Sequence, residues 1–326
     1  MKYYIGIDIG SVSTNVIAID EQYNVVFNEY IRANGQPLES VKKGMNLLHE
    51  KMQCKDEEIA GIGATGSGRE LAGVLVGADV IKNEITAHAT ATLHYHPDAS
   101  TIFEIGGQDS KIIILQDGMV TDFAMNTVCA AGTGSFLDHQ AERLGIPIED
   151  FGDMALSAEK DVRIAGRCTV FAESDMIAKQ QYGFSKAEII NGLCLALVRN
   201  YINNLGRGKT LKPPYIFQGG VAANKGIRAA FEREVNHNII IPQYFNVMGA
   251  IGSAILAKEA VEQKGVPSNF KGFNSLQLDF TPTSFECDGC SNMCEVIKVE
   301  SDGEIIAVWG DKCGKWAGTS KMSKQR

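Results

Sequence analysis

The sequence contains no apolar run that approaches the ~18 residues of a membrane-spanning helix, so we expect no membrane partner. It also lacks an excess of basic residues. Its 39 acidic residues outnumber 31 basic ones and give a net charge of -8, which argues against nucleic acid as a partner. The first residues, Met1 to Asp8, show no charged leader and no cleavage site. We therefore expect a cytoplasmic protein.

The G-x-x-x-x-G-K-[ST] pattern of P-loop nucleotide-binding proteins is absent as well. What is present is ordinary for a globular protein: 44% of the 326 residues are hydrophobic, and the length allows more than one core. The chain has eight cysteines. In a reducing compartment these indicate metal or redox chemistry rather than structural disulfides.

Strand and helix patterns alternate along most of the chain, which predicts an α/β protein. We expect a domain at 1–263 with two similar lobes, about 1–110 and 111–263. Residues 264–282 are expected to form a linker, and 283–326 a small cysteine-rich, metal-binding unit with a hairpin. The expected strands are 3–9, 15–19, 25–31, 59–65, 101–105, 111–115, 120–124, 215–218, 296–299 and 305–309. The expected helices are 38–52, 84–93, 135–144, 170–182, 186–205, 225–234 and 247–263.

Three glycine-rich segments each follow an apolar strand and predict a nucleotide site. Glycine lets the backbone approach a phosphate, and N–H and hydroxyl groups bind its oxygens. The segments read Asp8-Ile9-Gly10-Ser11-Val12-Ser13-Thr14, Glu104-Ile105-Gly106-Gly107-Gln108-Asp109 and Gly219-Gly220-Val221-Ala222-Ala223-Asn224. The nucleotide-binding candidates are Gly10, Ser11, Ser13, Thr14, Gly106, Gly107, Gly219, Gly220 and Asn224.

Four polar side chains in these segments are the catalytic candidates. Asp8, at the end of a strand, is expected to hold Mg²⁺ through water. Glu104, Gln108 and Asp109 are expected to orient metal or water. A further turn, Gly66-Ser67-Gly68, shows too little pattern to predict a role.

Cys129 and Cys168 each precede a predicted helix. Helix N-termini carry partial positive charge and free N–H groups, which favour a thiolate and an anionic cluster. Two thiolates are half of the set that usually holds a [4Fe–4S] cluster, and a symmetric dimer would supply the other half. The alternative is that both are buried structural cysteines, and spacing by itself leaves that alternative open.

The motifs taken together resemble the activator components of 2-hydroxyacyl-CoA dehydratases over roughly residues 3–260. The matching segments are the second and third glycine-rich loops, Cys129-Ala130-Ala131-Gly132-Thr133-Gly134 and Cys168-Thr169-Val170-Phe171-Ala172-Glu173-Ser174. The wider family includes the ATP-binding subunits of benzoyl-CoA reductases and the reductases of double-cubane-cluster proteins. The loop order is also similar to that of the acetate-kinase, sugar-kinase, actin and heat-shock-chaperone ATPases. This implies a two-lobed fold based on ribonuclease-H-like sheets.

The resemblance implies a homodimer in which Cys129 and Cys168 of each chain bind one bridging [4Fe–4S] cluster. Each subunit would hydrolyse ATP to ADP while a low-potential electron, supplied by a ferredoxin or flavodoxin, passes to a partner metalloenzyme. That partner would be a 2-hydroxyacyl-CoA dehydratase, an aromatic-ring reductase or a double-cubane protein. Glu104 stands where chaperone-like members usually have Asp. The alternatives are a sugar-type kinase on the same fold and a non-catalytic nucleotide-binding regulator.

A second set of cysteines begins with a CxxC pair, which favours a metal site. Zinc would make a structural knuckle, whereas a second [4Fe–4S] cluster would extend an electron path. The sequence does not choose between them. The set consists of Cys287, Cys290, Cys294 and Cys313. Of the other cysteines, Cys194 is expected in a helix core and Cys54 at the surface.

Overall fold

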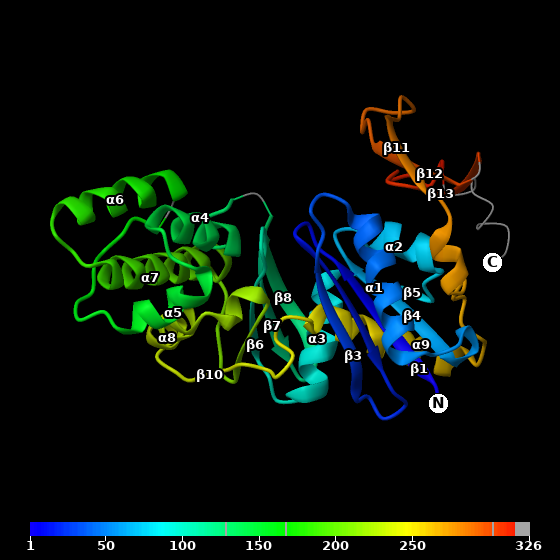
Figure 1. Cartoon of the computed structure of the whole chain (residues 1–326), viewed down its shortest axis with the longest axis horizontal. Helices are drawn as coiled ribbons and strands as arrows, with labels where there is room; N and C mark the ends of the chain where they lie inside the picture. Colours follow the sequence, from blue (N-terminus) through cyan, green and yellow to red (C-terminus); the bar gives the residue numbers. More distant parts are fainter. Residues whose placement is uncertain (128, 167, 302, 317–326) are drawn as a thin grey trace. The chain divides into compact units, whose positions relative to one another are not determined.

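A computed structural model of the chain describes residues 1–127, 129–166, 168–301 and 303–316 (Figure 1). It contains two compact units. Unit 1 consists of Met1–Asn83 together with Ser253–Arg326, and unit 2 consists of Glu84–Gly252. The sequence had divided the lobes near residue 110. The structure assigns 84–110 to unit 2 because the strand at 101–105 pairs with the hairpin that follows it.

Unit 1 contains a five-stranded sheet in the order β3-β2-β1-β4-β5. Strand β1 runs antiparallel to β2 and parallel to β4. Alternate residues of β1, Ile5, Ile7 and Ile9, join one buried core with side chains of helices α1 and α2. The elements are β1 (Tyr3–Ile9), β2 (Ser13–Ile19), β3 (Val25–Arg32), α1 (Pro37–Met52), β4 (Ile59–Gly66), α2 (Arg69–Val76) and β5 (Val80–Ile81).

Unit 2 repeats the same topology in its own five-stranded sheet, in the order β10-β9-β6-β7-β8. Here β6 runs antiparallel to β7 and parallel to β9. In each sheet, the turn between the first two strands therefore lies at the same edge as the C-terminal end of the neighbouring parallel strand, β4 in unit 1 and β9 in unit 2. The strands are β6 (Thr101–Ile105), β7 (Ser110–Gln116), β8 (Met119–Asn126), β9 (Tyr215–Gln218) and β10 (Ile239–Ile240).

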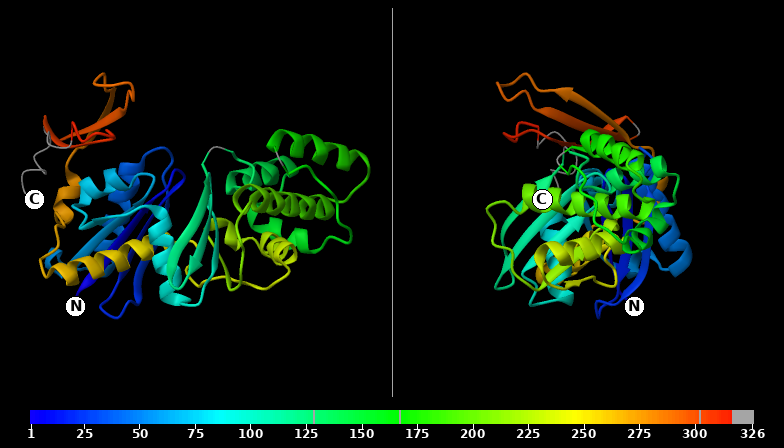
Figure 2. Two further views of the ribbon diagram at one scale, coloured as in Figure 1. Left: turned by 180° about the vertical axis from the view of Figure 1, so that it is seen from behind. Right: turned by 90° about the vertical axis from the view of Figure 1, so that its left-hand side faces the viewer.

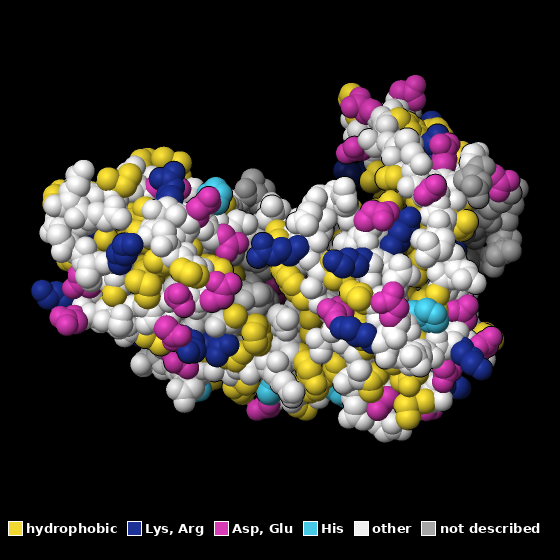
Figure 3. Space-filling model, viewed as in Figure 1, with side chains coloured by type: hydrophobic (Ala, Val, Ile, Leu, Met, Phe, Trp, Pro, Cys, Tyr) yellow, Lys and Arg dark blue, Asp and Glu magenta, His cyan; other side chains and the backbone are white. Residues whose placement is uncertain are grey.

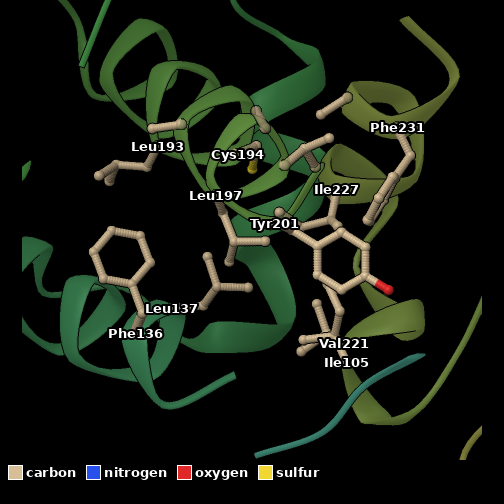
Figure 4. Close-up of a cluster of buried hydrophobic side chains, with 14 of the residues drawn as sticks. Ile105, Phe136, Leu137, Leu193, Cys194, Leu197, Tyr201, Val221, Ile227 and Phe231 are labelled. Carbon is tan, nitrogen blue, oxygen red and sulfur yellow. The ribbon is translucent and has the colours of Figure 1, made fainter. Parts of the chain in front are cut away.

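Helices cover both faces of the unit 2 sheet, and the two-residue alternation of β6 separates the two cores. Phe103 and Ile105 join the larger core, formed with α4–α8 (Figures 2 and 4). Ile102 joins a smaller core with Ile85 and Ala89 of α3. The helices are α3 (Glu84–Tyr95), α4 (Gly134–Leu144), α5 (Ile148–Leu156), α6 (Thr169–Gln181), α7 (Lys186–Leu205) and α8 (Lys225–Val235).

The segment that was expected to be a linker packs instead against unit 1. After α9 (Met248–Lys264), Asn269 N–H donates to Asp79 at 2.7 Å. The short 3₁₀ helix η3 (Phe273–Gln277) buries Phe273 and Leu276 in the unit 1 core. Cys54 also lies in this core and is 2% exposed, so the expected surface position is wrong. Packing against apolar side chains of the core buries Cys54, although charged residues follow it in the sequence.

A third, three-stranded antiparallel sheet ends the described chain, in the order β11-β12-β13. Its strands are β11 (Thr281–Glu286), β12 (Glu295–Ser301) and β13 (Glu304–Trp309). The expected hairpin is β12–β13, and β11 was not anticipated. Among the described residues, no helix has the length and apolar character to cross a membrane.

Candidate functional site

The first two glycine-rich segments form the same tight turn, one in each unit. In unit 1, Gly10 N–H donates to Ser13 O at 2.8 Å. In unit 2, Gly106 N–H donates to Asp109 O at 3.0 Å. Each turn joins the first two strands of its sheet and leaves backbone N–H groups at the sheet edge. Such concave backbone turns bind phosphate oxygens.

A glycine at the end of the neighbouring parallel strand packs against each turn. Gly66 has φ +93°, and a Cβ there would lie 2.3 Å from Ile9 O and 2.6 Å from Asp8 Oδ1. Gly219 has φ +88°, and a Cβ there would lie 2.3 Å from Ile105 O and 2.6 Å from Glu104 Oε1. Only glycine satisfies both the positive φ and the close approach. Gly66 therefore packs against the Gly10 turn of unit 1 in the same way that Gly219 packs against the Gly106 turn of unit 2.

The carboxylates of the two turns have different neighbours. Asp8 lies opposite Asn15 in the β1–β2 register, and Glu104 lies opposite Lys111 in the β6–β7 register. Lys111 is buried, and its ammonium bonds three carboxylates at once. The Nζ distances are 2.7 Å to Glu84, 3.0 Å to Glu104 and 2.9 Å to Asp109.

One ammonium cannot neutralise three carboxylates, and Glu104 is the most deeply buried of them. Burial raises the pKa of Glu104 to about 8, although Lys111 opposes that shift. Burial also acts against the Lys111 ammonium, but the carboxylates of Glu104, Glu84 and Asp109 outweigh it and raise the Lys111 pKa. Unit 2 thus holds a cation and a carboxyl of raised pKa beside its glycine-rich turn.

The other predicted site residues differ in exposure, and Ser13 is half-buried. Ser11, Gln108 and Gly220 are exposed at their turns, where water or a ligand reaches them. Thr14 is fully buried, and its hydroxyl shares a 2.6 Å hydrogen bond with Ser40. Asn224 caps α8 by accepting from Ile227 N–H at 3.1 Å. The structure therefore gives the side chains of Thr14 and Asn224 structural contacts rather than open positions.

The predicted cluster cysteines lie where their sequence positions indicated, ahead of two helices. Cys168 is the N-cap of α6, and its carbonyl accepts from Ala172 N–H at 3.0 Å. Cys129 is exposed, and its backbone is held by Asn126 through bonds of 3.0 Å and 2.7 Å. One small cavity is lined both by Ala131 and Gly132 of the Cys129 loop and by Cys168. The two cysteine loops are therefore neighbours, and neither thiol is buried.

The N-terminus of α4 connects the Cys129 loop directly to the second glycine-rich turn, at Gly106 and Gly107. Gly134 N–H donates to Gly106 O at 2.9 Å, and Ser135 N–H donates to Gly107 O at 2.8 Å. The Ser135 hydroxyl donates to Gly107 O at 2.6 Å. A displacement of the turn therefore moves the first residues of α4.

Apolar side chains are exposed on the elements that flank the cysteines. Val170 and Phe171, just after Cys168, are 63% and 66% exposed, and Tyr182 after α6 is 73% exposed. Met119 and Phe123 of β8 are also exposed. Figure 3 shows hydrophobic side chains at the surface in the region of α4 and α6. Neighbouring exposed apolar side chains such as Val170 and Phe171 are typical of an interaction surface.

The four C-terminal cysteines are free thiols in the structure. Across the described ranges, no three His, Cys, Asp or Glu side chains already meet in a metal-binding arrangement. The expectation of a metal at Cys287, Cys290, Cys294 and Cys313 therefore stays a prediction, as does the cluster at Cys129 and Cys168.

Lys111, Glu84, Gly66 and Ser135 were missed in the sequence. Lys111 and Glu84 belong to a strand and a helix that read as ordinary, and only tertiary folding brings them to Glu104. A signal existed for Gly66, because it follows an apolar strand as Gly219 does.

Comparisons with known proteins agree with this geometry. The sequence profile of the BadF/BadG/BcrA/BcrD ATPase family matches residues 5–257. The (R)-2-hydroxyglutaryl-CoA dehydratase activating ATPase of Acidaminococcus fermentans is 34% identical over 256 residues, covering 78% of this chain and 96% of that protein. The activator of lactoyl-CoA dehydratase of Anaerotignum propionicum is 33% identical, covering 80% of this chain and 100% of that protein.

Among solved structures, the activator of the 2-hydroxyisocaproyl-CoA dehydratase from Clostridium difficile with bound ADPNP has a TM-score of 0.74 and 32% identity. The match covers 82% of this chain and 98% of that one. The expected fold class, two sheets of the actin-like and sugar-kinase ATPase type followed by a small C-terminal unit, is confirmed.

Proposed function

The chain belongs to the BadF/BadG/BcrA/BcrD ATPase family, and from this premise we propose that it is an ATP-hydrolysing iron–sulfur activator. It would transfer single low-potential electrons to a partner metalloenzyme such as a 2-hydroxyacyl-CoA dehydratase or a double-cubane-cluster protein. Relatives named as activators of such dehydratases support this function.

The two matching turns support the binding of ATP with Mg²⁺. The backbone N–H groups of the Gly10 and Gly106 turns would bind phosphate oxygens. Asp8 would hold the metal through water, and the exposed Gln108 would orient the attacking water. The open surface at Gly220, where a Cβ would meet nothing within 4 Å, suits the adenosine. The relative that was solved with ADPNP binds its nucleotide on the same fold.

Cys129 and Cys168 fit a [4Fe–4S] cluster shared between two chains. Both thiols are accessible, both precede helices, and their loops line one cavity. Four thiolates are the usual ligand set, so one chain supplies half of it. When bound, the cluster would supply a one-electron carrier of low potential. The exposed Val170 and Phe171 beside Cys168 would be covered by the partner subunit of the homodimer.

Nucleotide turnover would reach the cysteines through α4. A change in the phosphate-bound Gly106-Gly107 turn pulls on Gly134 and Ser135 because three hydrogen bonds join them. The Cys129 loop enters α4 at these residues. ATP and water would give ADP and phosphate, while one electron enters from a ferredoxin or flavodoxin and leaves to the partner enzyme. This is a nucleotide-driven shift between two conformations.

The observation that supports this proposal most directly is that the two cysteine loops line one cavity, and that the Cys129 loop leads into α4, whose first residues are bonded to the second glycine-rich turn. The test is anaerobic purification of the parent chain and of Cys129→Ala and Cys168→Ala. The parent is expected to be brown with about four irons per dimer, and each variant to lose the iron while still binding ATP. Cys290→Ala, which removes an exposed thiol elsewhere, is the matched control and should keep the iron.

A colourless, iron-free parent would rule out electron transfer. ATP turnover that depends on an added sugar would then indicate the kinase alternative, and binding without turnover would indicate a regulator. Iron that survives Cys129→Ala would show that the ligand assignment is wrong.

A further inference from the structure

The C-terminal sheet has almost no core of its own. Its buried apolar side chains are Val296, Val299 and Ala307, and every residue of β11 is exposed. A three-stranded sheet of this size usually needs a disulfide, a metal or a large partner surface to hold one conformation. The structure places four cysteines where such a link would act.

The strand order brings the four cysteines to one edge of the sheet. Strands β11 and β12 end their pairing at Glu286 and Glu295, so the loop that contains Cys287, Cys290 and Cys294 lies at that edge. Cys287 N–H donates to Cys294 O at 2.8 Å, which closes the base of this loop.

The fourth cysteine reaches the same edge from β13. Because β13 runs antiparallel to β12, its last residue, Trp309, pairs with Ile297 near the start of β12. At Gly310 the chain passes so close that a Cβ would lie 2.4 Å from Glu295 O. Cys313 follows three residues later.

The turn that contains Cys313 folds back over Cys287. Trp316 Nε1–H donates to Cys287 Sγ at 3.4 Å, and the Trp316 ring packs edge-on against Phe285 with centroids 5.0 Å apart. A Cβ at Gly289 would lie 3.0 Å from Lys315 Nζ. The N–H donor supports a sulfur ligand, and the ammonium offsets the negative charge that four thiolates give a divalent ion.

We propose that Cys287, Cys290, Cys294 and Cys313 bind one structural Zn²⁺ that fixes the C-terminal sheet. The four thiols would turn toward a common centre, release their protons and complete a closed tetrahedral site. Zinc fits better than a second cluster. The spacing x2, x3 and x18 differs from the C-x2-C-x2-C-x3-C run of ferredoxins, and the site joins strand ends, as structural zinc sites do.

This site lies outside the proposed activator function. The family profile ends at residue 257, and the dehydratase activators compared above are covered over 96% and 100% of their length. Those relatives are therefore too short to contain a comparable C-terminal unit. Zinc here would hold a segment that this chain adds to the shared ATPase fold.

The test is metal analysis of the full chain, purified anaerobically, with zinc and iron measured separately. The parent is expected to contain about one zinc per chain. Cys287→Ser combined with Cys290→Ser should lower zinc at least fivefold and leave iron unchanged, whereas Cys129→Ser should lower iron and leave zinc unchanged. A parent without zinc, or one with about four additional irons per chain that the double variant loses, would overturn the proposal.

A second measurement uses the parent only and does not depend on a variant that folds. A mercurial reagent blocks the thiols while a chromophoric zinc indicator reports released metal. Zinc release that ends when about four thiols per zinc have reacted would support the site. Four thiols that react at once without zinc release, or two disulfides found by mass spectrometry, would contradict it.

Discussion

The two units build the same glycine-rich turn with different charges beside it. Asp8 and Glu104 each lie two residues before the first glycine of the turn, and Gly66 and Gly219 close the turns in the same way. Opposite Asp8 the sheet register places Asn15, whose Oδ1 has no hydrogen-bond partner among the described residues. Opposite Glu104 it places Lys111, which binds three carboxylates. The repeated fold thus has one turn with a neutral amide and one with a built-in cation.

This difference teaches that similar loops need not share one role. A carboxylate beside an amide can attract a hydrated Mg²⁺, whereas a carboxyl tied to a buried ammonium is already partly neutralised. We propose that Asp8 holds the metal and that Glu104 helps to hold the second turn in place. The following changes separate these roles.

The largest expected effect is on stability, from Lys111→Met. It removes the one ammonium among Glu84, Glu104 and Asp109, and we expect a loss of about 3–5 kcal/mol because a buried carboxylate loses its partner. Chemical unfolding followed through unit 2 measures it. Lys225→Met, which breaks an exposed pair with Asp153 in the same unit, should cost less than about 1 kcal/mol. Equal losses of unfolding free energy would show that the buried Lys111 ion pairs stabilise unit 2 no more than the exposed Lys225–Asp153 pair does.

Asp8→Asn should lower ATP turnover about 100-fold, because the hydrated metal would lose the carboxylate that holds it through water. Glu104→Gln should lower it less than about tenfold, since Lys111 already lies beside that group. Steady-state phosphate release measures both, and the iron content should be the same in both variants. If Glu104→Gln proves the more damaging, the metal belongs to the second turn.

Gly66→Ala and Gly219→Ala test the similarity of the two turns rather than their difference. Each should destabilise its unit by about 2 kcal/mol, because the added Cβ meets a carbonyl oxygen and the backbone has positive φ. Gly118→Ala is the matched control, since it also has positive φ but nothing lies within 4 Å of its Cβ. If the three variants have the same melting temperature, the close approach of a carbonyl oxygen is not the reason that glycine is required at positions 66 and 219.

The last expected effect is on the pH dependence of stability. The pKa of Glu104 is raised to about 8 by burial, so the folded state keeps a proton that the unfolded state has lost. This contribution is complete below the unfolded pKa of about 4.5 and is lost as pH rises toward 8.

Glu104→Gln mimics the protonated group and should remove that dependence. At about 1.4 kcal/mol per pH unit, its free energy of unfolding relative to the parent should rise by about 4 kcal/mol between pH 5 and pH 8. Urea unfolding at several pH values measures the difference. A difference that does not change with pH would show that Glu104 is ionised throughout.

The sequence by itself determined many of the elements but not all of them, since α2, α5 and β11 were not predicted. Hydrophobic period and glycine position predicted β1, β6, α7 and β9 almost to the residue, because buried strands and amphipathic helices have strong local signals. The same local signals located Cys129 and Cys168 ahead of helices. The proposal that ATP and a cluster bind at these places rests on family resemblance in addition to the residues.

Only the tertiary structure decided which side chains meet. Lys111 reaches Glu104 through the strand register, Glu84 joins them from α3, and Thr14 turns inward to Ser40. The four C-terminal cysteines reach one sheet edge because β11 and β13 end at that edge and β12 begins there. Local sequence cannot specify these contacts, since each depends on residues distant in the chain that pairing and packing bring together.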